Sequence, residues 1–204
     1  MARAKCSVVD RDTALVVEGL RAALQNSGLS QAGFARALET SASRFSTYLS
    51  GSTSPSAAFF MRAQRLADGL NVAGLLRRAT PGSTSIALRA ALGEGDEVWA
   101  LKMVLQGRDD VRALLSGDGA GADAWECDPG ALDEPAWDAL LSAVVAHEFE
   151  SVGRSAPRWT QRAAGTGPWI FANPYFDADE VRRRTPPWLA ERGVHLAGRD
   201  LVTA

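Results

Sequence analysis

The sequence predicts a mainly α-helical protein, with an N-terminal domain of five helices and a mostly helical C-terminal domain rich in tryptophan and proline. Apolar side chains recur three and four residues apart over much of the chain, as one buried face of a helix requires. A serine, threonine or aspartate precedes several of these segments, where its side chain can cap the first amides of a helix. The 204 residues, of which 46% are hydrophobic, suffice for two cores.

The chain is expected to begin with a loose basic arm over residues 1–12, which is either a disordered tail or a segment that enters a minor groove. The first helix is predicted over residues 13–26, and Ser27 and Gly28 end it. Its apolar stripe comprises Leu15, Val16, Leu20, Ala23 and Leu24. This helix should support the two short helices that follow.

Residues 29–51 are predicted to form two short helices with a tight break between them. Ser30 and Ser41 each begin a helix as a capping residue, and residues 39–40 form the break. Gly51 ends the second helix. The side chains with three-and-four spacing should face the core, namely Phe34, Ala35, Leu38, Phe45, Tyr48 and Leu49.

The second of these helices is expected to expose a face that carries no carboxylate. That face comprises Ala42, Ser43, Arg44, Ser46, Thr47 and Ser50. A face without carboxylates lies against phosphates without repulsion, and its small side chains allow the backbone to enter a major groove. Two packed helices, the second of which reads a groove, form the helix-turn-helix design.

This part of the chain, over residues 13–70, resembles the helix-turn-helix region of the Xre/Cro/C1 family, which includes lambda repressor. The matching positions are Ser30, Gln31, Phe34, Ala35, Leu38, Ser41, Phe45 and Gly51, followed by a matching helix over 55–67. The resemblance implies a lambda-repressor-like DNA-binding domain over residues 13–79. The sequence departs from the family at Glu39, where glycine is usual, and at the reading face, whose one long side chain is Arg44.

The family's contact pattern implies which residues meet DNA. Gln31 would contact a phosphate and a base edge. The second helix would face the duplex through Ser41, Ala42, Ser43, Arg44 and Thr47. Arg62 and Arg65, on the helix that follows, are either phosphate clamps or solvated surface residues.

The helix after this pair is predicted to have Ser54 as its cap and Pro55 in its first turn, where proline loses no hydrogen bond. A further short helix is expected to start at Asn71. The sequence Thr-Pro-Gly-Ser from Thr80 is typical of a break, so we place a domain boundary there.

Residues 80–116 are predicted to form a helical connector, with helices over 85–92 and 96–115. Helices after the reading helix often build a dimer contact in members of the family. Trp99 and Met103 lie four residues apart, so they would share one helix face, either in such a contact or in the core of the monomer.

The glycine-rich residues 117–132 are predicted to be a flexible linker, and residues 133–204 a C-terminal domain that binds a partner or a ligand. A helix is expected over 133–152, a short helix after Thr185, and an extended piece over 194–196. This part weakly resembles antitoxin-like regulators encoded beside bacterial toxins. The resemblance lies in Ala156-Pro157-Arg158-Trp159, Thr185-Pro186-Pro187, Leu189, Arg192-Gly193-Val194 and Asp200-Leu201.

Charge is distributed unevenly along a chain whose net charge is −2. Residues 1–79 hold ten basic and five acidic side chains, whereas the remainder holds 12 basic and 19 acidic ones. A positive N-terminal third on a negative body is expected if that third alone touches phosphate.

The sequence offers no paired acid, base or nucleophile that would indicate catalysis. We expect neither an enzyme nor a bound cofactor or metal. Cys127 lies beside two acids that would raise its pKa and make it a poor nucleophile. His147 lacks the second histidine of a zinc-protease helix. The acids Asp177, Asp179 and Glu180 match no calcium loop, and the arginines at 182–184 are a solvated face or a contact for an anionic partner.

The cellular compartment is predicted from the cysteine count and from the lack of targeting or membrane-spanning segments in the sequence. Two cysteines are too few for a disulfide framework, and neither a signal peptide nor an apolar run of membrane-spanning length appears. A cytoplasmic protein without membrane contact is therefore expected.

Three functions remain. The leading one is a sequence-specific transcriptional regulator, a repressor, that binds an inverted-repeat operator in double-stranded DNA as a homodimer. The second is an antitoxin that neutralises a toxin through residues 133–204 and autoregulates its operon. The third is a ligand-sensing repressor whose tryptophan-lined second domain forms an apolar pocket.

Overall fold

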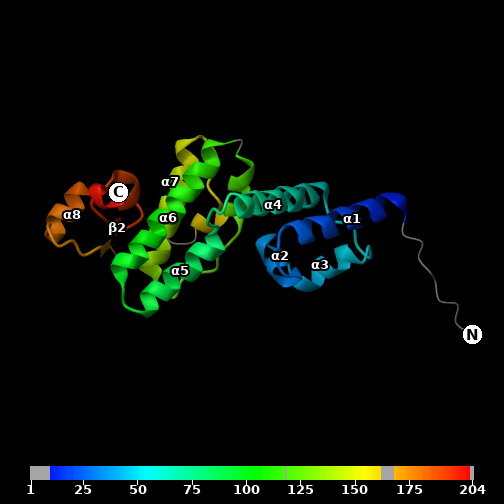
Figure 1. The fold of residues 1–204 in the computed structure, drawn as a ribbon, viewed down its shortest axis with the longest axis horizontal. Coiled ribbons are helices and arrows are strands. Elements are labelled where there is room, and N and C mark those ends of the chain that lie inside the picture. Colours follow the sequence, from blue (N-terminus) through cyan, green and yellow to red (C-terminus); the bar gives the residue numbers. More distant parts are fainter. Residues whose placement is uncertain (1–9, 118, 162–167, 203–204) are drawn as a thin grey trace, which may run out of the picture.

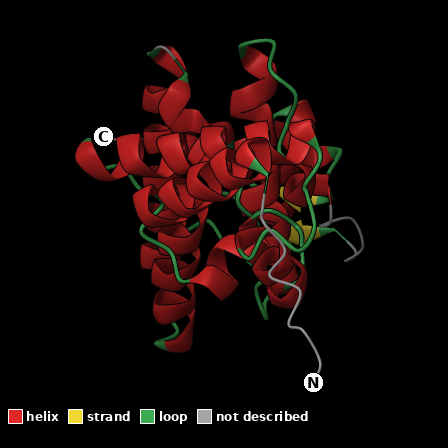
Figure 2. Cartoon of the chain, turned by 90° about the vertical axis from the view of Figure 1, so that its right-hand side faces the viewer, coloured by secondary structure: helices red, strands yellow, loops and turns green. Residues whose placement is uncertain are grey.

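The computed structural model describes residues 10–117, 119–161 and 168–202. Within them the chain is mainly α-helical, as the sequence predicts (Figure 2). The molecule is elongated (Figure 1): α1, α2 and α3 lie at one end, α5, α6 and α7 in the middle, and the C-terminal segment at the other end. The helix α4 runs between the first two groups.

The N-terminal core is enclosed by α1 (Arg11–Asn26), α2 (Gln31–Ala37), α3 (Ala42–Leu49) and the first half of α4 (Ala57–Leu75). Its completely buried aromatic side chains, Phe34 and Phe45, meet edge to face with ring centroids 5.6 Å apart. Leu15, which the sequence places in the apolar stripe of α1, is instead 58% exposed.

The helix α4 differs from its prediction at both ends. Its cap is Ser56 rather than Ser54, because the Ser56 hydroxyl accepts a hydrogen bond from the Phe59 amide at 3.2 Å. The short helix expected from Asn71 is not separate, since α4 continues to Leu75. Its second half is held in helical form by a second set of neighbours, with Gly69 and Ala73 buried.

Those neighbours come from the segment that the sequence predicts to be a flexible linker. Residues Ala120–Glu126 form a 3-10 helix, η1, and Trp125 within it is completely buried. A Cβ atom on Gly69 would lie 2.6 Å from the Ala124 amide nitrogen, so glycine is what allows the backbones of α4 and η1 to touch. The prediction of a flexible linker is wrong there because glycines such as Gly121 serve close packing: a Cβ atom on Gly121 would lie 2.6 Å from a methyl carbon of Leu114.

The larger core lies between α5 (Pro81–Gly93), α6 (Glu97–Ser116) and α7 (Pro135–Ser151). The predicted break at Thr80 marks the cap of α5, where Thr80 and Ser83 form a reciprocal capping box. The link between α4 and α5 is fixed by the buried carboxylate of Asp110, which accepts hydrogen bonds from Arg78 and from the Ala79 amide, both at 3.0 Å.

The C-terminal segment wraps around α7 in short pieces. Two-residue strands β1 (Trp169–Ile170) and β2 (Val194–His195) pair in parallel, and β2 lies in the piece predicted to be extended. The other pieces are η2 (Arg158–Gln161), α8 (Ala178–Arg184), α9 (Pro187–Ala190) and η3 (Gly198–Leu201). Of the acids weighed as binding groups, Asp179 and Glu180 pair with the arginines of α8, for example Asp179 with Arg182 at 2.7 Å, whereas Asp177 caps the helix.

Most tryptophans serve the core of the monomer. Trp125, Trp137 and Trp159 are at most 4% exposed, whereas Trp99 is 49% exposed. The expectation that Trp99 packs in the core of the monomer is therefore wrong, and Met103 beside it is only partly buried. The proposed dimer contact of these two residues stays a prediction.

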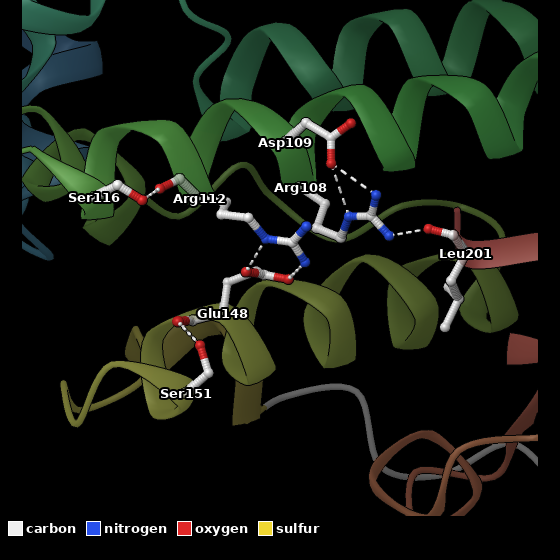
Figure 3. A network of polar contacts seen from close by, with 7 residues as sticks. All are labelled: Arg108, Asp109, Arg112, Ser116, Glu148, Ser151 and Leu201. Carbon is white, nitrogen blue, oxygen red and sulfur yellow. Dashed lines mark hydrogen bonds and ion pairs between the residues drawn. The ribbon is translucent and has the colours of Figure 1, made fainter. Parts of the chain in front are cut away.

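A polar network joins α6 to α7 and to the end of the described chain (Figure 3). The Arg112 guanidinium donates two hydrogen bonds to the Glu148 carboxylate at 2.8 and 2.6 Å, and the Glu148 side chain is 5% exposed. These hydrogen bonds raise the pKa of Arg112. Arg108 on the preceding turn of α6 donates to the Leu201 carbonyl.

Among the described residues, no helix combines the length and hydropathy that crossing a membrane requires.

We expect Gly69→Ala to lower the free energy of unfolding by about 2 kcal/mol, because the new methyl group would overlap the η1 backbone. Gly74→Ala on the same helix is the matched control: nothing lies within 4 Å of its Cβ position, and it should be neutral or stabilising by up to about 1 kcal/mol. Urea unfolding of both variants measures this. Equal effects would show that α4 and η1 do not touch through Gly69.

Arg112→Met should cost about 3 kcal/mol of stability, because it leaves the Glu148 carboxylate buried without its partner. The double variant Arg112→Met with Glu148→Leu should recover most of that loss. On α8, Arg183→Met removes an exposed pair with Glu180 and should cost less than about 1 kcal/mol. Denaturant unfolding at neutral pH compares the three variants. A double variant no more stable than Arg112→Met would refute the role given to the pair.

Candidate DNA-binding interface

The turn between α2 and α3 has the geometry of a helix end closed by a left-handed residue. The Thr40 amide donates to the Ala35 carbonyl and the Glu39 amide to the Arg36 carbonyl, both at 2.9 Å. Glu39 has a φ of 56°, which is the conformation that glycine adopts most readily. The glutamate therefore occupies the backbone position of the glycine usual in the resembled family, and the turn keeps its shape.

The two faces of α3 are separated as predicted. Phe45 is completely buried and Tyr48 is 7% exposed, so α3 is anchored through these rings. The residues expected on the outer face are all exposed, namely Ala42, Ser43, Arg44, Ser46, Thr47 and Ser50. Ser41 caps the helix by accepting a hydrogen bond from the Arg44 amide at 3.1 Å. The result is an open helix face without a carboxylate.

Arg44 is the one long side chain on that face, and it is oriented by its own helix. Its Nε donates to the Tyr48 hydroxyl at 3.0 Å, which leaves its two terminal nitrogens without a partner among the described residues. A guanidinium held at one nitrogen and free at the other two is suited to a bidentate contact with a guanine edge or a phosphate. Thr47, one turn on, bonds back to the Arg44 carbonyl at 2.8 Å.

The other predicted contacts divide between the two helices that flank α3. Gln31 is exposed at the first position of α2, behind the Ser30 cap. Arg62 on α4 is only partly exposed, because its guanidinium donates to the Leu38 carbonyl and pairs with Glu39 at 3.4 Å. Arg62 therefore holds the turn, and its role as a phosphate clamp stays a prediction.

Arg65, the alternative clamp, faces the acids of η1, with nitrogen-to-oxygen distances of 3.8 Å to Asp123 and 3.9 Å to Glu126. Burial and the carboxylate of Asp123 raise the pKa of Glu126, and Arg65 opposes that rise. This arginine thus serves the contact between α4 and η1. Of the basic arm predicted over residues 1–12, residues 1–9 lie outside the described residues. The prediction is wrong for the rest, since Asp10 caps α1 and the helix begins at Arg11.

Glu39 is the interface residue whose connections the sequence did not reveal. It accepts from Arg62 of α4 and, at 3.2 Å, from Arg158 of η2. The turn before α3 is thereby connected to the C-terminal part of the chain, 119 residues away. The one hint of these ion pairs in the sequence is a glutamate where the Xre/Cro/C1 family, which this segment resembles, usually has glycine. That hint does not indicate which residues Glu39 pairs with.

Of the two groups weighed for catalysis, Cys127 is buried and His147 packs against an aromatic ring. Burial raises the pKa of the Cys127 thiol to about 12, and the carboxylates of Glu126 and Asp128 contribute to the rise. The prediction of a poor nucleophile is confirmed, although burial is a larger cause than the acids. His147 stacks on Trp188 with ring centroids 4.2 Å apart.

Comparison with known proteins agrees with this geometry. The model of a family described as a helix-turn-helix domain matches residues 17–80, which span most of α1, all of α2, α3 and α4, and the link to α5. No curated protein and no solved structure matches the chain significantly. Residues 17–80 of this chain are therefore similar to a helix-turn-helix domain, a class of domain that binds DNA.

Proposed function

We propose that this protein is a sequence-specific transcriptional regulator of the Xre/Cro/C1 type that acts as a repressor. The observation that carries the proposal is the outer face of α3, which is exposed, carries no carboxylate and presents Arg44 with two guanidinium nitrogens that no described residue contacts. A helix of this kind enters the major groove, while the N-terminus of the helix before it lies near a phosphate. Gln31 at the start of α2 would supply that second contact.

The proposed regulator acts in the cytoplasm as a homodimer. Two copies related by two-fold symmetry would place their α3 helices in successive major grooves, about one helical turn apart. The operator is then an inverted repeat. No catalytic step and no cofactor enters this proposal.

Selection of bound sequences from a random pool of duplex DNA tests the proposal, because it examines sequence preference and symmetry together. Enrichment of an inverted repeat with half-sites about one helical turn apart would support a dimeric reader. Recovery of unrelated sequences at every salt concentration would overturn sequence-specific recognition.

A second candidate, an antitoxin, is favoured by large apolar side chains that remain exposed within residues 133–204, where Tyr175 is 76% and Val152 52% exposed. Buried tryptophans, in contrast, are not available as anchors for a partner. Co-expression of the intact chain with the product of a neighbouring gene tests this candidate. Rescue of growth together with a stable complex would support it, and a harmless neighbouring product would count against it.

Arg44→Ala should relax base preference at one operator position by roughly 1–3 kcal/mol, because it removes the long side chain of the reading face. Binding titrations with single-base variants of the selected operator measure the change. Arg183→Ala, on α8, is the control and should leave the preference intact. An equal loss of affinity for operator and random DNA would mean that Arg44 contacts only phosphate.

Glu39→Gln should strengthen binding to any duplex, because it removes a carboxylate from the turn before α3 and breaks the ion pairs of Arg62 and Arg158, while Arg62 keeps its hydrogen bond to the Leu38 carbonyl. If one of these arginines gains a phosphate, affinity at 0.1 M salt should rise by up to about eightfold, and the logarithmic salt slope should steepen by about 0.9. Titrations across a salt series measure both quantities. Weaker binding would instead mean that the Glu39 pairs are needed to position α3.

A further inference from the structure

A pocket of about 600 Å³ lies far from the reading face, between the N-terminal half of α6 and the C-terminal segment. One wall comes from residues 98–106 of α6, and the other from residues 171–174 and 199–202. Its volume falls within the range of roughly 300–1,000 Å³ that is typical of small-molecule sites. Nothing in the helix-turn-helix function accounts for it.

The mouth of this pocket leaves large apolar side chains in water. Val98 is 63% exposed, Val202 is 72% exposed, and Trp99 is the most exposed of the six tryptophans. Met103 and Phe171 line the same space. A ligand with an apolar ring would remove these surfaces from water, which is the main favourable contribution to binding at such a site.

The charged side chains of the pocket differ in whether they already have a partner within the protein. Asp200 is already satisfied, since Asn173 donates to it at 2.7 Å and Arg199 lies 3.9 Å from it. Arg199 in turn stacks over the rings of Tyr175 and Phe176. Lys102 forms no ion pair with any described residue, and its Nζ lies 5.5 Å from the centre of the Trp99 ring.

Lys102 is also unusual because this chain has two lysines, Lys5 and Lys102, among its 22 lysine and arginine residues. Its ammonium group is compact, carries three donors and is held beside an aromatic ring at the edge of an apolar cavity. That combination suits a single anionic group attached to an apolar body.

We propose that this pocket binds a small amphipathic anion with an aromatic ring. Its anionic group contacts the Lys102 ammonium, and its ring packs on Trp99, Met103 and Phe171. The proposal concerns the body of the protein and does not depend on DNA binding.

Two fluorescent probes that differ chiefly in charge test the proposal on the intact protein. The anionic probe is 8-anilinonaphthalene-1-sulfonate, and the neutral one is N-phenyl-1-naphthylamine. The sulfonate should bind with one-to-one stoichiometry. Lys102→Gln should weaken its binding about tenfold through loss of a charge-assisted contact, but change that of the neutral probe less than twofold. Trp99→Ala should weaken the binding of both probes.

Leu75→Gln is the control, because Leu75 is 75% exposed on α4 and does not line the pocket. It should leave both affinities unchanged, and thermal unfolding should confirm that every variant is folded. Unchanged sulfonate affinity in Lys102→Gln, or an equal loss in Leu75→Gln, would overturn the proposal. A dimer that becomes monomeric in Trp99→Ala would also overturn it, since the pocket would then be a subunit contact.

A measurement without variants examines the same contact. The sulfonate should slow acetylation of Lys102 relative to Lys5 when both sites are followed by mass spectrometry, whereas the neutral probe should not. If the sulfonate leaves the ratio of the Lys102 rate to the Lys5 rate unchanged, that result would contradict contact between the anion and Lys102.

Discussion

The contact between the backbones of α4 and η1 is the constraint on which the rest of the structure depends. Gly69 permits it, because any side chain at that position would overlap the Ala124 amide. One helix thereby belongs to both cores: its first half closes the helix-turn-helix core, its second half packs against η1, and Leu70 touches both cores. The reading helix is consequently placed by the body of the protein as well as by its own domain.

The charge of the interface follows from which arginines are already used. Arg62 and Arg158 both pair with Glu39, and Arg65 faces the acids of η1. Arg44 is different, because the one partner of its guanidinium among the described residues is Tyr48 of the same helix. Part of the positive charge of the N-terminal third is therefore already paired with carboxylates of the protein. Under the proposed function, sequence preference would depend on the Arg44 guanidinium and on a close fit of small side chains.

Local signals in the sequence predicted the elements that depend on local interactions. Ser30 and Ser41 cap helices where expected, and α3 buries Phe45 while it exposes Arg44. The failures concern contacts between distant segments. Gly121 looked like part of a flexible linker, although it admits Leu114 and Val72. The pairing of Glu39 with Arg158 and the pocket beside Lys102 arise only when the chain folds back, so spacing along the sequence carried no signal for them.

A photocrosslink from α3 to DNA tests the central claim most directly. A benzophenone side chain replaces Thr47 in one sample and the exposed Tyr175 in another, and each is irradiated with its selected duplex. If α3 lies in the major groove, crosslinks should form from position 47, map to bases within each half-site and be absent from position 175. Crosslinks from position 175 alone, with none from position 47, would show that another surface binds DNA.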